Sequence, residues 1–103
     1  RRPTAVFAVN DLAALGAIAA AQDAGLRVPD DVSIVGYNDL PSVGRARPAL
    51  TTVRVPLYEM GRLGANLLID MLDGGGAGRP AQVVLPVELV VRGSTAPPVP
   101  EAA

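Results

Sequence analysis

Two apolar runs that each end in an Asn-Asp pair constrain the fold of this chain more than any other feature. The first run, from Thr4 to Val9, ends at Asn10-Asp11. The second run, from Val32 to Tyr37, ends at Asn38-Asp39. Runs of this length and composition are typical of buried strands. The two pairs recur at a spacing of 28 residues, which fits one strand–helix–strand unit of about 30 residues. The sequence therefore predicts an α/β fold with a parallel sheet flanked by helices.

The parallel arrangement predicts where the polar pairs lie. Two strands joined by such a crossover run in the same direction, so both Asn-Asp pairs leave the sheet at one edge. In open α/β sheets, ligands bind outside the carboxyl ends of the strands. Asn10 or Asp11 could equally cap the helix that follows by accepting a bond from a free backbone N–H. The recurrence of the pair favours a shared hydrogen-bonding site over two unrelated caps.

Glycine and proline residues mark where further secondary-structure elements begin and end along the rest of the chain. A helix is predicted from Asp11 to about Ala24, because Gly25 and Pro29 end its apolar spacing. Helix-compatible spacing returns after Pro56, a residue suited to the first turn of a helix. The later elements that we expect are a loop with one helical turn over 40–48, a strand over 50–55, a helix over 56–73, a glycine turn over 74–78, a strand over 82–91 broken at Pro86, and a disordered tail from Ser94.

The composition excludes several kinds of chemistry. The chain has no Cys and no His, which excludes thiol catalysis, a Ser-His-Asp arrangement and an ordinary zinc site. Its net charge of −1 argues against nucleic-acid binding through this segment. No apolar run is long enough to span a membrane, so we expect no membrane partner. The densest basic group is expected to form solvated surface or subunit contacts, and it consists of Arg45, Arg47, Arg54 and Arg62.

The chemistry of the Asn-Asp pairs favours a neutral ligand. A phosphate at the first helix would meet the carboxylate of Asp11, which disfavours anions. Asp11, Asp39 and the Asn carbonyls could hold Mg²⁺ or Ca²⁺, but no liganding loop pattern is present, so we expect no metal and no cofactor. Asn donates and accepts while Asp accepts from hydroxyls, a combination suited to a sugar or nucleoside. Without an activated nucleophile or an acid–base pair, binding is favoured over catalysis, and we expect no enzyme.

Several motifs occur in a fixed order along almost the whole chain. They lie at Pro3 to Ala17, Gly25 to Asp39, Pro48 to Val53, Glu59 to Gly61 and Leu85 to Thr95. Together they resemble the C-terminal part of LacI/GalR-type bacterial transcription regulators. The resemblance implies a partial periplasmic-binding-protein-like (type I) fold, in which two α/β lobes close on a small effector. It also implies that the fold is incomplete without an N-terminal portion.

The same resemblance implies a division of the chain. Residues 1–95 would be the C-terminal segment of an effector-binding and dimerisation domain, which crosses between the lobes. The expected parts are residues 1–52 mainly in the C-terminal lobe, 53–86 mainly in the other lobe, 87–95 as the returning strand, and 96–103 as a disordered tail.

Site residues follow from the resemblance position by position. Asn10 and Asn38 match effector contacts; Asp is frequent in the family where this chain has Asn38. Asp11 and Asp39 are expected to hold these contact residues in place without touching the effector, or to cap a helix. The residues that match the family's dimer surface are Leu12, Leu15, Arg45 and Ala46.

The resemblance implies a cytoplasmic homodimeric regulator that binds a small neutral effector, with a sugar as the expected class. It would reach operator DNA only through a helix-turn-helix preceding Arg1. Two alternatives stay open at this point. The chain could belong to an exported sugar-binding protein of a transport system, or it could be a dimerising remnant that binds no ligand.

Overall fold

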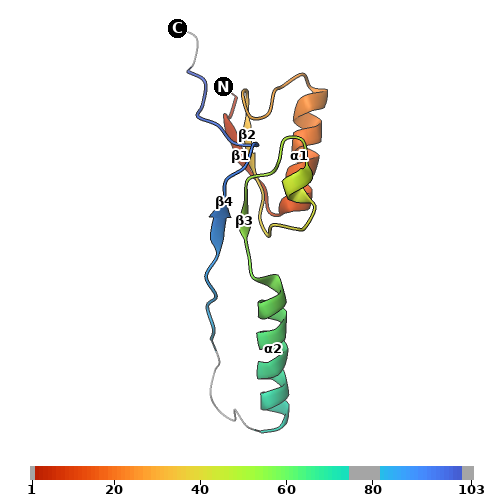
Figure 1. The fold of residues 1–103 in the computed structure, drawn as a ribbon, viewed down its shortest axis with the longest axis vertical. Coiled ribbons are helices and arrows are strands. Elements are labelled where there is room, and N and C mark those ends of the chain that lie inside the picture. Colours follow the sequence, from red (N-terminus) through yellow and green to blue (C-terminus); the bar gives the residue numbers. More distant parts are fainter. Residues whose placement is uncertain (1, 75–81, 101–103) are drawn as a thin grey trace. The chain divides into compact units, whose positions relative to one another are not determined.

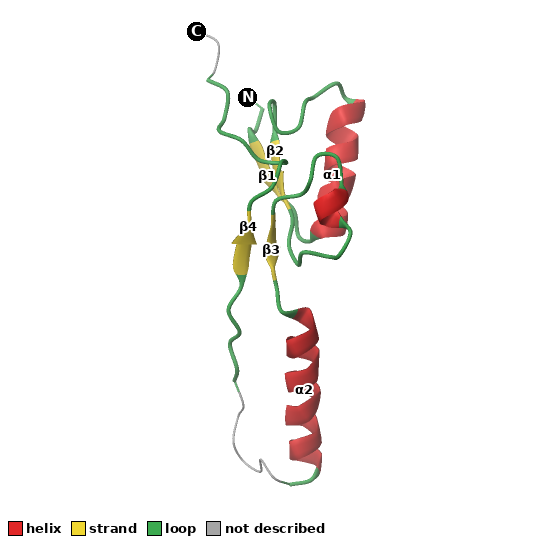
Figure 2. Cartoon of the chain, in the orientation of Figure 1, coloured by secondary structure: helices red, strands yellow, loops and turns green. Residues whose placement is uncertain are grey.

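The computed structural model describes residues 2–74 and 82–100. The chain forms two compact units, one made of Arg1–Val55 with Glu88–Ala103 and the other of Pro56–Val87. Whether these units correspond to the two expected lobes stays a prediction. The elements in chain order (Figures 1 and 2) are β1 Ala5–Phe7, α1 Asp11–Asp23, β2 Ser33–Val35, η1 Val43–Arg45, β3 Thr52–Arg54, α2 Leu57–Leu72 and β4 Glu88–Val90.

The two Asn-Asp runs form the predicted parallel pair. β1 lies beside β2, with Ala5 opposite Ser33 and Phe7 opposite Val35. Both strands are shorter than the apolar runs, yet the backbone bonding goes further. The Ala8 amide donates to the carbonyl of Val35 at 2.9 Å, one residue past the end of β1. The α/β class predicted from the spacing is therefore confirmed.

Helix α1 packs on one face of this strand pair (Figure 1) and makes the core of the first unit. The helix starts after Asn10 and stops at Asp23, followed by Gly25 at φ +81°, in the left-handed region that glycine adopts without steric cost. The start and the glycine stop were both predicted. The buried apolar side chains come from α1, from β2 and its flank, and from the 43–50 loop, and they are Ala14, Ile18, Val32, Ile34, Val43 and Leu50.

A second strand pair adjoins the first in the same unit. β3 pairs antiparallel with β4, with Thr52 opposite Val90 and Arg54 opposite Glu88. Two isolated parallel bridges join Val35 to Thr51 and Asn38 to Arg54, so the chain from the end of β2 onward runs beside β3. The polar edge of the parallel pair is thereby tied directly to the antiparallel pair.

The strand predicted over 82–91 is correct only for its last part. Residues 82–87 have no strand pairing, and Pro86 has no N–H with which to bond a neighbour. The apolar residues of this segment favour a strand, but a strand also needs a neighbouring strand to pair with. Here the pairing with β3 begins at Glu88. The predicted glycine turn begins with Gly74 at φ +77°, and its later residues lie outside the described part of the chain.

The prediction of a disordered tail from Ser94 is wrong at its start. The Ser94 side chain is fully buried; its hydroxyl accepts from the Thr51 amide at 2.8 Å and donates to the Ile34 carbonyl at 2.6 Å. Ala96 also exchanges hydrogen bonds with the Ser33 hydroxyl, at 3.0 and 3.1 Å. The Pro and Ala content predicted disorder, whereas these partners come from distant segments. Residues 97–100 have no helix or strand, and 101–103 lie outside the described residues.

Helix α2, which the apolar stripe after Pro56 predicted, lies in the second unit together with the segment over 82–87. None of its residues is buried within the chain. Met60, Leu63 and Leu67 line an apolar cavity of about 370 Å³ together with Val83 and Leu85. In the described part of the chain, no helix is both long enough and apolar enough to cross a membrane.

We expect Ser94→Ala to destabilise the protein by about 2–4 kcal/mol, because it removes the partner of a buried N–H and of a buried carbonyl. Urea denaturation measures the change. Ser42→Ala is the matched control, since Ser42 precedes η1 without a side-chain capping bond; we expect a change within about 0.5 kcal/mol. Equal losses in the two variants would contradict the bridging role of Ser94.

Candidate functional site

The structure brings the two Asn-Asp pairs together at the carboxyl edge of β1 and β2. The backbone N–H of Asp11 donates to the carbonyl of Tyr37 at 3.1 Å. Asp11 follows Asn10 and Tyr37 precedes Asn38, so the two pairs are joined by this bond. The parallel crossover had predicted this meeting, and the four polar side chains define the candidate site.

Asn10 caps α1 and still has unused polar groups. Its Oδ1 accepts a hydrogen bond from the Ala13 amide at 2.8 Å. Among the described residues, nothing accepts a bond from its side-chain NH₂ group. The side chain is half-buried. Asn10 therefore combines the structural role of a cap with a free donor at the edge of the sheet.

Asn38 has a fixed backbone and a free side chain. Its N–H donates to the Val53 carbonyl at 2.8 Å, and its carbonyl accepts from the Val55 N–H at 3.3 Å. Its φ of 118° and the φ of 62° at Asp39 lie in a backbone region that residues other than glycine seldom adopt, although Asn and Asp tolerate it best. Such strain costs about 1–3 kcal/mol per residue and clusters at functional sites. No described residue hydrogen-bonds the Asn38 carboxamide, which leaves it open to a ligand.

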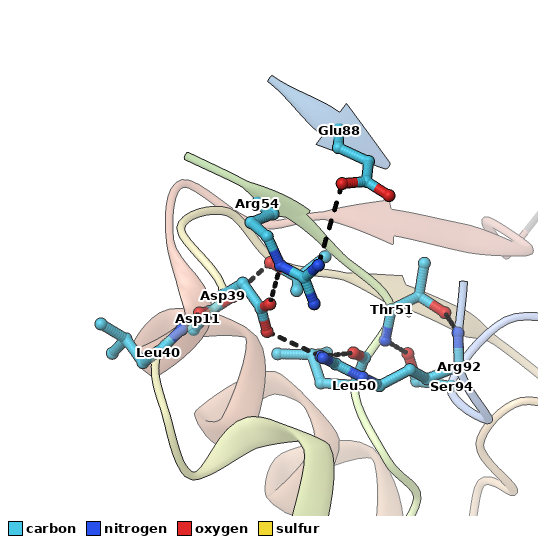
Figure 3. Close-up of polar contacts among 10 residues, drawn as sticks. Asp11, Asp39, Leu40, Leu50, Thr51, Arg54, Glu88, Arg92 and Ser94 are labelled. Atoms are coloured by element: carbon cyan, nitrogen blue, oxygen red, sulfur yellow. Dashed lines mark hydrogen bonds and ion pairs between the residues drawn. The ribbon is translucent and has the colours of Figure 1, made fainter. Parts of the chain in front are cut away.

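Asp11 is a buried anchor (Figure 3). Its side chain has no exposed surface, and its two oxygens accept from the Thr52 hydroxyl at 2.6 Å and the Leu40 amide at 2.7 Å. It lies in the first turn of α1, where the helix dipole favours a negative charge. A Cβ at Gly36 would clash with Asp11 Oδ1 and lie 2.9 Å from Leu50. Glycine at position 36 therefore makes room for the carboxylate.

Asp39 lies in an ion-pair cluster (Figure 3). One oxygen is 2.8 Å from Arg92 Nη1 and the other is 2.8 Å from Arg54 Nε. Arg54 also lies 3.8 Å from the carboxylate of Glu88. The hydrogen bond from Arg92, followed by that from Arg54, lowers the pKa of Asp39. The side chains of Asp39 and Arg92 are 9% and 21% exposed, so solvent screens this pair weakly, whereas the Arg54 side chain is 52% exposed and its pair is screened more strongly.

Two sequence interpretations change with this geometry. Asp39 caps no described helix, because η1 starts at Val43 and is preceded by Ser42. Arg54 is half-exposed but paired with Asp39, so it is not part of a purely solvated basic surface. In both cases the residue is engaged by a segment that is distant in the chain.

The arrangement leaves a neutral rim. Asp11 is bonded by neutral donors inside the fold, and Asp39 is balanced by two arginines. The groups left for a ligand are the carboxamides of Asn10 and Asn38. Carboxamides donate and accept hydrogen bonds without charge, which matches hydroxyl groups on a small molecule. In the described residues, no three potential ligand side chains form a group that could hold a metal ion.

The four residues expected at a dimer surface have different environments. Leu12 is 72% exposed on α1, whereas Leu15 is half-buried against the core. Arg45, at the end of η1, is exposed, and Ala46 beside it is half-buried. Their role in dimerisation stays a prediction.

Thr52 and Arg92, which hold the two aspartates, were not predicted as site residues from the sequence. Thr52 has no exposed surface although it is polar, and Arg92 reaches the Leu50 carbonyl at 3.0 Å as well as Asp39. A lone Thr in a strand gives no signal. Arg92 lies directly after the strand predicted over 82–91, and this position at a strand end was the one sequence signal that could have indicated a role in the site.

Comparisons with known proteins agree with this architecture. Residues 1–95 match the family described as periplasmic binding protein-like domain. The chain is 48% identical over 93 residues to the HTH-type transcriptional regulator MalR of Streptomyces coelicolor, covering 90% of this chain and 27% of MalR. Among solved structures, it is similar to the transcriptional regulator CelR–cellobiose complex, with a TM-score of 0.81 and 42% identity over 88% of this chain and 28% of that one. It also resembles a Lac repressor dimer bound to operator and the anti-inducer ONPF, with a TM-score of 0.79 and 39% identity over 90% of this chain and 32% of that one.

The chain therefore belongs to the family of periplasmic binding protein-like domains, in the form found in LacI-type transcription regulators. It spans about a quarter of the length of MalR. These relatives are transcription regulators.

The lowered pKa of Asp39 predicts an acid-dependent contribution to stability. Its folded pKa lies below the unfolded value, so the ionised carboxylate stabilises the fold above the unfolded pKa, and this stabilisation is lost as the pH falls through the folded pKa. We expect Asp39→Asn to be less stable at neutral pH, with the difference shrinking between about pH 5 and about pH 2. Urea denaturation across this range measures it.

Glu59→Gln is the control for this pH series, because Glu59 pairs with Arg62 at 3.0 Å on an exposed helix face. Exposed pairs of this kind contribute at most about 1 kcal/mol. A pH-independent difference between Asp39→Asn and the wild-type protein would contradict the prediction.

Proposed function

We propose that this chain is the effector-binding and dimerisation segment of a LacI-type regulator that responds to a small neutral hydroxylated molecule, with a sugar as the favoured class. The effector binds at the carboxyl edge of β1 and β2, and the carboxamides of Asn10 and Asn38 hydrogen-bond its hydroxyls. The protein acts by binding and not as an enzyme. Operator DNA is contacted through a separate helix-turn-helix and the regulator acts in the cytoplasm.

One observation supports this proposal above the others. At the edge where the two Asn-Asp pairs meet, both carboxylates are bonded inside the fold, while both carboxamides keep polar groups that no described residue engages. A charged ligand would find no free counter-charge on these four residues. A hydroxylated neutral ligand would find donors and acceptors on two rigid supports, a helix cap and a fixed turn.

The relatives support the same class of ligand. The CelR structure contains cellobiose, and a LacI family regulator from Enterococcus faecium contains ribose. Both are neutral sugars. The relatives matched are regulators, so the transport alternative is not favoured.

Dimerisation is proposed from the exposed apolar side of α1. Leu12 exposes 72% of its surface although it is a large apolar residue in a helix whose opposite side forms the core. The Lac repressor structure similar to this chain is a dimer. A contact between two α1 helices would remove Leu12 from water.

Two carboxamide variants test the effector site. Asn10→Ser keeps a capping oxygen but removes the NH₂ group, and Asn38→Gly keeps the positive φ but removes the side chain. We expect each to weaken sugar binding about tenfold, because each loses about one hydrogen bond to the ligand. Calorimetry of the full-length protein with cellobiose, ribose and a sugar phosphate provides the measurement.

Asn10→Ala serves as the stability control, since it loses both the cap and the donor. It is expected to cost about 1 kcal/mol of stability in addition to the loss of binding, whereas Asn10→Ser retains most of the stability. Tighter binding of the sugar phosphate than of either neutral sugar would contradict a neutral effector. So would unchanged binding in both carboxamide variants, or no binding of either neutral sugar by the wild-type protein.

A charge at position 12 tests the dimer surface. We expect Leu12→Asp to raise the dimer dissociation constant about a hundredfold, because a buried interface carboxylate lacks a partner, while the unfolding free energy of the monomer changes by only about 0.5 kcal/mol. Sedimentation equilibrium gives the constant. Leu72→Asp is the control, as Leu72 is 78% exposed on α2. The surface would be wrongly placed if the Leu72 variant dissociated and the Leu12 variant did not.

A further inference from the structure

The Asp39 carboxylate joins two arginines that are far apart in the chain (Figure 3). Arg54 is the last residue of β3, and Arg92 lies two residues beyond the end of β4. Each donates to a different oxygen of Asp39, at 2.8 Å. Both oxygens are therefore engaged, and the side chain is 9% exposed. Asp39 is placed to hold other groups rather than to contact a ligand.

The residue before Asp39 depends on the same neighbourhood. Asn38 is bonded through its backbone to Val53 and Val55, on either side of Arg54. Asn38 and Asp39 both have positive φ, so the turn is strained and needs tertiary contacts to persist. The ion pairs of Asp39 and the backbone bonds of Asn38 thus attach one strained turn to one strand.

These contacts lie where the chain leaves the first unit and returns to it. The first unit includes residues up to Val55 and resumes at Glu88. Arg54 and Glu88 are opposite each other in the β3–β4 register, and their charged groups are 3.8 Å apart. Arg92 follows on the returning segment and also bonds the Leu50 carbonyl before β3. Asp39 therefore contacts both the outgoing and the returning segments.

We infer that Asp39 is a positioning residue that fastens the strained Asn38 turn to the outgoing and returning segments through Arg54 and Arg92, and thereby holds the Asn38 carboxamide ready for the effector. The claim about the effector rests on the proposed function. The claim about the turn stands on the contacts alone. Without the two ion pairs, the turn relaxes out of its positive-φ conformation and the Asn38 side chain loses its fixed direction.

Residue-level hydrogen exchange of the full-length protein tests this inference. In Asp39→Asn, we expect the amides of Asn38 and Val55 to exchange about tenfold faster, because their mutual support is lost. The Ile34 amide, which donates to the Ser94 carbonyl at 2.9 Å, reports the general loss of stability in Asp39→Asn, and we expect its exchange to accelerate at least about threefold less than that of Asn38 and Val55. Equal acceleration at all three amides would mean general destabilisation and would overturn the inference, as would no acceleration at Asn38.

Arginine variants give a second test with a matched control. Arg54→Gln is expected to accelerate the same two amides, and the double variant with Asp39→Asn should accelerate them no more than Asp39→Asn alone, since the two residues act through one contact. Arg62→Gln is the control, with a side chain 51% exposed against 52% for Arg54 and a partner at 3.0 Å. An identical effect of Arg62→Gln on Asn38 would overturn the inference.

Binding of cellobiose and ribose separates the inference from the proposed function. We expect Asp39→Asn to lower the affinity for whichever of the two sugars binds by about tenfold, although neither Asp39 oxygen is free to contact the sugar. Unchanged affinity with a loosened turn would overturn the link to the effector. If neither sugar binds the wild-type protein, the proposed function fails, while the exchange rates at Asn38 and Val55 still decide whether Asp39 positions the turn.

Discussion

The fold of the first unit depends on one buried carboxylate. Asp11 is fully enclosed, and it binds the Thr52 hydroxyl and the Leu40 amide while it begins α1. A buried charge without partners would be strongly destabilising. Three segments therefore have to meet with the Thr52 hydroxyl and the Leu40 amide in place: α1, β3, and the turn that follows β2. Gly36 follows from the same constraint, because a side chain there would occupy the space of the carboxylate.

Around this anchor, charge is neutralised inside the fold and amides are left at the rim. Asp39 is balanced by Arg54 and Arg92, and Glu88 lies beside Arg54. In the proposed site, the two aspartates of the Asn-Asp pairs hold the backbone in place, and the two asparagines contact the ligand. This division follows from the cost of desolvation. A carboxylate can be buried when fixed partners bond it, whereas a neutral carboxamide can stay exposed to water with little loss of free energy.

The segments at the carboxyl end of the chain complete the first unit. Ser94 joins the β2 backbone to the segment before β3 with a single hydroxyl, and Arg92 closes the ion-pair cluster. Residues more than forty positions apart thus share hydrogen bonds at the base of the site. These contacts place the support of the candidate site on the segments by which the chain leaves the first unit at Val55 and re-enters it at Glu88.

The sequence by itself determined the parallel strand pair, the helix between the strands and the common edge of Asn10 and Asn38. These features follow from local periodicity, caps and the direction that a crossover imposes, all within about 30 residues. Only the tertiary structure decided that Asp39 pairs with Arg54 and Arg92, that Thr52 binds Asp11, and that Ser94 is buried and not part of a loose tail. Each of these contacts joins side chains from separate segments, and no local pattern of polar residues specifies a distant partner.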